Sequence, residues 1–163
     1  LLDGIGDDLS IPASTSLAFG TVNFTMEAFI KITAAPTSGA YTFGQRAFGG
    51  FNMFILSDLR FAGLTPGLNS VAEPSPSMVT GTWYHVAFTR DTSNLYRIFV
   101  DGVLRASNTL PAENGSATGV SRVGQNGDND RYFNGRIDEL RLTKGVCRYT
   151  ANFTPPAAPF PDA

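Results

Sequence analysis

The 163-residue sequence has little of three things that often define a protein's chemistry: cysteine, histidine and charge. Cys147 is the single cysteine, which excludes an intrachain disulfide and a cluster of thiolate metal ligands. His85 is the single histidine. Charged residues make up 16% of the chain and the formal net charge is −2, so the basic footprint of a nucleic-acid-binding protein is missing. We expect no nucleic-acid partner and a fold held by its core.

Long apolar runs are also missing. No segment approaches the roughly 20 apolar residues that cross a bilayer, and no basic start followed by an apolar stretch marks a signal peptide. We therefore expect a soluble chain without membrane insertion. The sequence begins Leu-Leu-Asp-Gly rather than with Met, and we expect it to be a processed product or a piece cut from a longer polypeptide.

Phenylalanine, glycine and proline are abundant, with 13, 17 and 10 copies, which favours strands joined by tight turns. The length fits one β domain. Between residues 22 and 32 every second residue is apolar; these residues are Val22, Phe24, Met26, Ala28, Ile30 and Ile32. The residues on the opposite face are Asn23, Thr25, Glu27, Phe29 and Lys31. We predict a strand whose first face lies in the core and whose second is a solvated outer face.

Two further patterns predict antiparallel strands. Segments Tyr84–Arg90 and Leu95–Val100 are joined by turn residues, and Asp101-Gly102 then has the sequence of a type I′ hairpin turn, so we expect three consecutive strands. In segment Gly135–Thr143, Ile137 is apolar in one phase, whereas Leu140 and Leu142 are apolar in the other. We predict a β-bulge at Asp138–Glu139 that returns both phases to the core.

Five short motifs occur in an order and spacing that are together fairly specific. They are Asp3–Asp7 (DGIGD), Phe24–Ala28 (FTMEA), Trp83–Ala87 (WYHVA), Val100–Gly102 (VDG) and Phe133–Arg141 (FNGRIDELR). In these motifs the chain resembles the laminin-G-like, concanavalin A-type jelly-roll family. It departs from the family pattern at Asp8 and Phe29, where the family often has an aromatic residue and Trp. The resemblance implies an all-β, antiparallel β-sandwich over residues 1–145.

Residues 146–163 form a proline-rich tail, and four prolines favour an extended strap that lies along the sandwich or leads to another domain. We assign this strap to the same domain. The tail is similar to the ending of such modules in bacteriophage tail and other virion proteins. That resemblance implies a place on the virion surface, in a tail or head fibre; the alternative is a bacterial-surface or secreted protein.

Catalysis is not predicted. Glycosidases of the same broad fold use a motif such as E-x-D-x-E to place an acid and a nucleophile, and this motif is absent. Glu27 has no acidic residue within two positions, and we expect it to be solvated. The nucleophile elbow G-x-S-x-G is missing as well. His85 is expected to be a hydrogen-bonded structural residue between aromatic neighbours.

Calcium is the one cofactor that the acidic, glycine-rich corners suggest, because it takes six to eight oxygen ligands. Asp128-Asn129-Asp130 begins like an EF-hand loop, but Tyr132 and Phe133 occupy positions that the loop needs for a ligand and for Gly. The family resemblance implies two other candidates. The candidates are Asp7 or Asp8 together with Asp138, and Asp58 or Asp101 with loop carbonyls. Ordinary turn-capping aspartates are the alternative.

A glycan site needs exposed aromatic faces beside polar and charged side chains. One candidate cluster consists of Tyr41, Phe43, Gln45 and Arg46. The other consists of Asn126, Asp128, Asn129, Asp130, Arg131 and Tyr132. Core packing and a solvated hairpin are the respective alternatives, and we prefer the second cluster as a site. We predict a non-catalytic adhesion module that binds cell-surface polysaccharide; the alternative is a decoration or spacer domain that contacts other virion protein chains and has no glycan ligand.

Overall fold

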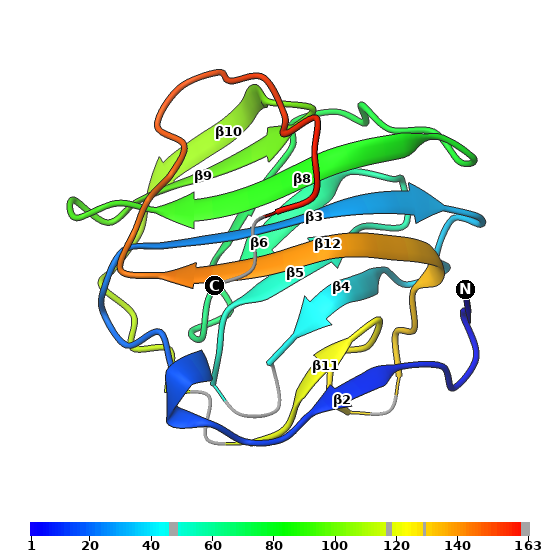
Figure 1. The fold of residues 1–163 in the computed structure, drawn as a ribbon, viewed down its shortest axis with the longest axis horizontal. Coiled ribbons are helices and arrows are strands. Elements are labelled where there is room, and N and C mark those ends of the chain that lie inside the picture. Colours follow the sequence, from blue (N-terminus) through cyan, green and yellow to red (C-terminus); the bar gives the residue numbers. More distant parts are fainter. Residues whose placement is uncertain (46–48, 117–118, 129, 161–163) are drawn as a thin grey trace.

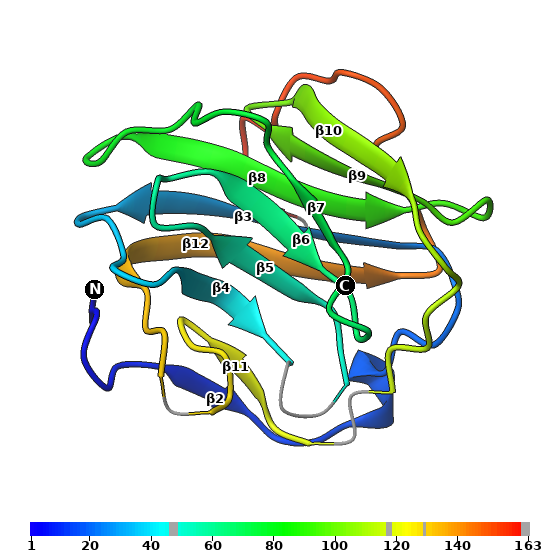
Figure 2. The same cartoon turned by 180° about the vertical axis from the view of Figure 1, so that it is seen from behind.

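The computed structural model describes residues 1–45, 49–116, 119–128 and 130–160. Two antiparallel sheets of six strands each face one another (Figures 1 and 2). The first sheet has the order β1 (Leu2–Asp3), β12 (Asn134–Lys144), β3 (Phe24–Ile32), β8 (Trp83–Arg90), β9 (Leu95–Val100) and β10 (Val103–Thr109). The second has the order β2 (Leu9–Ile11), β11 (Ser121–Val123), β4 (Ala40–Gly44), β5 (Asn52–Ile55), β6 (Phe61–Leu64) and β7 (Ser70–Ala72). The predicted all-β sandwich is confirmed.

Helix is limited to one short 3-10 turn, η1 (Thr15–Leu17), in the part of the chain that the structure describes. Ser14 caps this turn, because its side-chain oxygen accepts a hydrogen bond from the backbone N–H of Ser16. Within the same residues, no helix has the length and apolarity of a membrane span.

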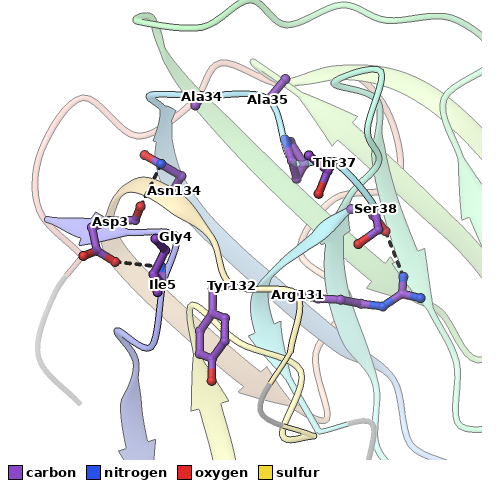
Figure 3. A pocket seen from close by; sticks show the side chains of 12 residues that line it. Asp3, Gly4, Ile5, Ala34, Ala35, Thr37, Ser38, Arg131, Tyr132 and Asn134 are labelled. Carbon is purple, nitrogen blue, oxygen red and sulfur yellow. Dashed lines mark hydrogen bonds between the residues drawn. The ribbon is translucent and has the colours of Figure 1, made fainter.

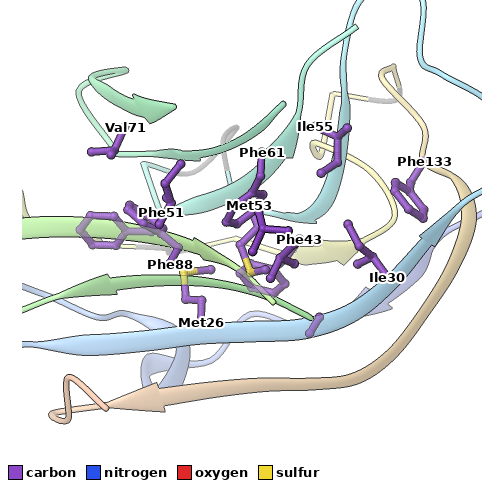
Figure 4. Close-up of a cluster of buried hydrophobic side chains, with 14 of the residues drawn as sticks. Met26, Ile30, Phe43, Phe51, Met53, Ile55, Phe61, Val71, Phe88 and Phe133 are labelled. Carbon is purple, nitrogen blue, oxygen red and sulfur yellow. The ribbon is translucent and has the colours of Figure 1, made fainter. Parts of the chain in front are cut away.

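The core between the sheets is rich in phenylalanine. In Figure 4, Met26 and Ile30 of β3 lie opposite residues of the second sheet such as Phe43. The ring of Phe24 lies 4.6 Å from that of Phe51, centre to centre. Each fully buried side chain of this size contributes on the order of 1.5–3 kcal/mol. The apolar face predicted for residues 24–32 is therefore confirmed.

The first residue of that predicted face is an exception. Val22 is 40% exposed, because β3 begins only at Phe24 and residues 21 and 22 lie in the preceding turn. The alternation of apolar and polar residues begins at Val22, before the strand itself starts. The prediction that Val22 lies in the core was therefore wrong.

The opposite face of β3 differs more strongly from the prediction of a solvated surface. Thr25 and Glu27 are both 0% exposed, because residues 146–160, here called the strap, cross the outer face of the first sheet (Figure 1). Thr25 Oγ1 donates to Val146 O at 2.9 Å. Further along the strap, Phe153 N donates to Gly102 O at 2.9 Å. The expected solvated face is wrong at these positions.

The predicted hairpin and bulge are both present. Strands β8, β9 and β10 pair consecutively, and Asp101 and Gly102 have φ values of 49° and 74°, as a type I′ turn requires. A Cβ on Gly102 would lie 1.9 Å from Phe153 O, so glycine also lets the strap approach.

The bulge lies in β12, where the pairing with β3 shifts register between Asp138 and Arg141 and Glu139 has a φ of 51°. Ile137, Leu140 and Leu142 consequently all pack against the core, as the two-phase pattern predicted.

Candidate functional site

One end of the sandwich carries a cavity of about 300 Å³, here called the rim cavity. Three segments line it: residues 3–5 near the N-terminus, the β3–β4 connection at residues 34–39, and residues 131–134 except Phe133. In Figure 3, Asp3 and Asn134 lie on one side, Thr37 and Ser38 on the other, and the Tyr132 ring between Ile5 and Arg131.

The local sequence explains why this end of the sandwich is open. The β3–β4 connection contains two alanines, Ala34 and Ala35, whose side chains take up little of the space that a larger residue would fill. Gly39 ends the connection with a φ of 89°, and a Cβ there would lie 2.1 Å from the Phe54 ring. Arg131 has a φ of 54°, which is uncommon for a residue with a side chain and directs the chain around the cavity.

The guanidinium of Arg131 is held in place and keeps most of its donors unpaired among the described residues. Its Nη1 donates to Ser38 O at 3.0 Å, and its Cζ lies 6.0 Å from the centre of the Phe54 ring. A guanidinium has five N–H donors, so several are left for a ligand. The side chain is half-buried, which orders it without removing it from solvent.

The opposite wall is polar and carries an acceptor. Asp3 Oδ1 accepts from Ile5 N at 2.7 Å, and Asn134 Nδ2 donates to Asp3 O at 2.8 Å. Asp3 is exposed, as are the hydroxyls of Thr37 and Ser38. The cavity thus combines an aromatic ring, a guanidinium, a carboxylate and hydroxyls, which can hydrogen-bond a hydroxyl-rich ligand and pack on an apolar ring face.

Of the predicted second cluster, Arg131 and Tyr132 line this cavity. Asn126 does not: it is 1% exposed and accepts from Asp128 N at 2.8 Å, so it shapes its own loop. Its amide also donates to Asp130. Asp128 and Asp130 are exposed but do not line the cavity. Asn129 lies outside the described residues.

The first predicted cluster does not offer an aromatic surface. Tyr41 is 0% exposed, with its ring centre 4.8 Å from that of Phe54 and Ala62 in the same buried cluster. Tyr41 therefore packs in a buried cluster, which was the alternative considered for it. The prediction that its ring contacts a ligand does not hold in this structure. The reason is that β4 is covered on both faces. Arg46 lies outside the described residues.

The aspartates considered for calcium have protein partners. Asp8 Oδ2 accepts from Arg122 Nη1 at 2.7 Å, and Asp7 Oδ2 accepts from Asp3 N at 3.1 Å. Asp138 Oδ1 accepts from Glu139 N at 2.9 Å.

The other candidate pair is also engaged. Asp58 pairs with Arg60 at 2.7 Å, and Asp101 Oδ1 accepts from His85 N at 2.8 Å. Across the described ranges, no three Asp, Glu, His or Cys residues form a group that could hold a metal ion. Calcium binding stays an untested prediction.

A second polar cluster lies under the strap, and sequence reasoning missed it. Glu27 Oε2 lies 3.1 Å from His85 Nε2 and accepts from the Tyr149 hydroxyl at 2.7 Å, while Oε1 accepts from Arg141 Nε at 2.9 Å. The Tyr149 ring stacks on Phe153 with 3.6 Å between centres. The expectation that Glu27 is solvated was wrong, whereas a hydrogen-bonded His85 among aromatic rings is what the structure shows.

The charges of this cluster follow from its contacts. Burial opposes the ionised form of Glu27, but hydrogen bonds from His85, Tyr149 and Arg141 outweigh burial and hold the pKa of this carboxyl below its usual range. Burial and the bond to Glu27 raise the pKa of Tyr149 to about 12. Glu27 is therefore a buried carboxylate that a substrate cannot reach. No local motif indicates its contacts with Arg141 and Tyr149, because these residues lie more than 110 positions further along the chain.

Comparison with protein families assigns the chain. A profile described as concanavalin A-like lectin/glucanases superfamily, Laminin_G_3, matches residues 3–147, which is most of the sequence. The chain belongs to the Laminin_G_3 family. The motif-based resemblance to laminin-G-like and concanavalin A-like domains is thus confirmed. None of the curated proteins matches this Laminin_G_3 domain in sequence.

Several solved structures share the fold. A Bacteroides ovatus protein whose description proposes carbohydrate binding is 20% identical, with a TM-score of 0.72 over 91% of this chain and 44% of that one. The CBM40 domain of a Ruminococcus gnavus IT-sialidase, bound to α2,3-sialyllactose, is 16% identical, with a TM-score of 0.64 over 90% and 95%.

A heptameric SAP-like pentraxin from Limulus polyphemus is 16% identical, with a TM-score of 0.61 over 86% of this chain and 74% of that one. Identities at this level establish the shared fold. This Laminin_G_3 domain spans less than half the length of the Bacteroides ovatus chain.

Proposed function

We propose that this Laminin_G_3 domain is a non-catalytic glycan-binding module and that its ligand occupies the rim cavity. The observation that carries the proposal is that Tyr132, Arg131 and Asp3 all line one open cavity of about 300 Å³. An aromatic ring packs against the apolar face of a sugar, and charged groups at its side fix the hydroxyls.

The charge balance of the cavity favours a ligand rich in hydroxyl groups over a strongly charged one. Its lining includes one cation, Arg131, and one carboxylate, Asp3. The guanidinium supplies donors and the carboxylate supplies acceptors, whereas a sugar hydroxyl can be either. The exposed hydroxyls of Thr37 and Ser38 extend this surface.

The shared fold supports the same proposal. The Ruminococcus gnavus domain is described in complex with α2,3-sialyllactose, and carbohydrate binding is proposed in the description of the Bacteroides ovatus protein. Because a fold hosts many functions, this support concerns glycan binding as a class, and the site itself rests on the residues of the rim cavity.

We propose a non-catalytic module because the rim cavity lacks a pair of carboxylates among its described lining residues. Hydrolysis of a glycosidic bond uses two of them, roughly 5–5.5 Å or 6.5–9.5 Å apart. Among the described residues that line the rim cavity, Asp3 is the single carboxylate. Glu27, with His85 beside it, is sealed beneath the strap.

The proline-rich tail at residues 146–163 supports a biological setting for glycan binding. Its resemblance to the endings of phage tail and other virion modules favours a place on a virion, in a tail or head fibre, where the module would attach to host polysaccharide. A bacterial-surface or secreted protein is the other setting that fits. The competing function is a decoration or spacer domain that contacts other virion chains.

A glycan array tests the proposal directly. The unaltered domain should bind a restricted set of glycans, and Tyr132→Ala should weaken that binding about tenfold, the equivalent of one lost aromatic contact of about 1.4 kcal/mol. Tyr132→Phe is the matched control, because it keeps the ring and should keep most of the affinity. A silent array for the folded domain would favour the decoration function; binding that survives Tyr132→Ala would move the site elsewhere.

A further inference from the structure

A second cavity lies beside the rim cavity, and no predicted glycan residue lines it. This cavity of about 450 Å³, here called the indole groove, is lined by Leu2, Trp83, Arg136, Ile137 and Asp138, among others. Trp83 begins β8, whereas Arg136 and Asp138 lie in β12, so the groove crosses the end of the first sheet.

Cross-strand pairing places the polar groups of the groove together. Lys31 of β3 pairs with Trp83 on one side and with Arg136 on the other, so the three residues form one row across the sheet. Directly paired side chains lie on the same face. The bulge that begins at Asp138 turns the strand just beyond this row.

The groups in the groove are open to solvent and largely unpaired. Trp83 is 41% exposed, an unusual position for the only tryptophan of a chain. Within the described residues, neither the Trp83 indole nor the Arg136 guanidinium has a hydrogen-bond or ionic partner, and Asp138 uses only Oδ1, toward Glu139 N. An aromatic face, a set of free donors and a free acceptor therefore meet in one cavity.

The two cavities are neighbours with matching chemistry. Leu2 pairs with Gly135 and Asp3 with Asn134, and these consecutive rungs of the β1–β12 ladder line the indole groove and the rim cavity respectively. Lining residues of the two cavities are thus one step apart along this ladder. Each cavity holds one exposed or half-buried aromatic residue, one arginine and one aspartate.

We propose that the indole groove is a second sugar subsite and that the domain binds several consecutive units of a polysaccharide rather than one terminal sugar. This inference rests on the proposed function of the rim cavity. A sugar fits the groove because Arg136 supplies donors and Asp138 an acceptor for its hydroxyls, and because a solvated indole is a stacking surface for a sugar ring. Because adjacent rungs of one ladder line the two subsites, one oligosaccharide can reach both.

Trp83 itself supplies the readout, because it is the only tryptophan and its fluorescence reports on the groove alone. The probes are the strongest glycan from the array and its monosaccharide and disaccharide fragments. The longer glycan should change the fluorescence and bind about tenfold or more tightly than the monosaccharide, since a second linked contact adds affinity. The monosaccharide should bind without that change.

Two variants separate the subsites. Arg136→Gln alters an exposed residue, so the fold should be retained; it should weaken binding of the longer glycan severalfold and leave monosaccharide binding unchanged. Trp83→Phe keeps an aromatic ring and should retain most of the affinity for the longer glycan. Trp83→Ala should lose the part of that affinity that the groove adds. Thermal unfolding of each variant checks the fold.

The outcomes distinguish the inference from the function beneath it. If Tyr132→Ala removes binding while Arg136→Gln and Trp83→Ala leave it unchanged, the rim cavity is the whole site and the inference is overturned. A Trp83 fluorescence that stays constant with every bound glycan would overturn it as well. If the folded domain binds no glycan on the array, both the inference and the proposed function fail.

Discussion

The strap-covered face and the open end of the sandwich contain the same kinds of residues in opposite states. Under the strap, the guanidinium of Arg141 and the hydroxyl of Tyr149 both donate to the carboxylate of Glu27. At the open end, Arg131 and Tyr132 face a cavity. Residue type alone therefore does not mark a site. A carboxylate whose acceptor sites are all filled by groups of the same chain is structural. A carboxylate that keeps unpaired acceptor sites is available to a ligand.

The largest expected effect comes from removing the centre of the buried cluster. Glu27→Ala leaves His85, Tyr149 and Arg141 without their shared acceptor, and breaking a buried pair of this kind costs about 3–5 kcal/mol. Chemical denaturation measures the loss of unfolding free energy. Asp58→Ala is the control: it removes the exposed ion pair with Arg60 and should leave stability unchanged. Equal effects would mean that the buried cluster stabilises the fold no more than an exposed ion pair does.

A smaller effect should appear in acid. The pKa of Glu27 is lower in the folded protein than its ordinary value of 4.5, so its contribution to stability is present above that value and is lost as the pH falls through the folded pKa. Denaturation midpoints measured on both sides of this value should fall less steeply in acid for Glu27→Gln than for the unaltered protein. Parallel curves would mean that Glu27 has the same pKa in both states.

The smallest expected effect concerns calcium at the aspartates predicted from the sequence. If Asp7, Asp8 and Asp138 contribute to a calcium site, calcium should raise the thermal midpoint relative to EDTA by linkage. Because Asp8 is already paired with Arg122, we expect a shift of only a few degrees. Asp138→Asn is the matched variant and should abolish the shift. Equal midpoints with calcium and with EDTA would contradict the calcium prediction made from the sequence.

Local features of the fold were predictable from sequence because their causes are local. Asp101-Gly102 defines its turn through backbone conformation, and the change of phase between Ile137 and Leu140 signals the bulge. Burial of Glu27 was not predictable in the same way, because Tyr149 and the strap cover it from the far end of the chain. Periodicity shows that a residue faces outward from its sheet, but not whether another segment lies on top.

The residues of the candidate site were likewise predictable only in part from the sequence. Arg131 and Tyr132 were predicted from a polar loop with an aromatic residue, and they line the rim cavity. Tyr41 has similar composition around it, yet its ring is buried against Phe54. Trp83 gave no signal as a ligand residue, since its motif resembles a strand of the family. Its exposure depends on strands that the sequence could not place beside one another.

Gly102 has a consequence for the order of folding. Its turn joins two adjacent strands and can form early, because it closes a very short loop, whereas Phe153 reaches it from far along the chain. The strap can dock only after the hairpin has presented Gly102 O and left room where a Cβ would collide. We therefore expect the strap to dock late, so that its contacts act mainly by slowing unfolding. On this expectation, the strap over Glu27 prolongs the lifetime of the folded domain.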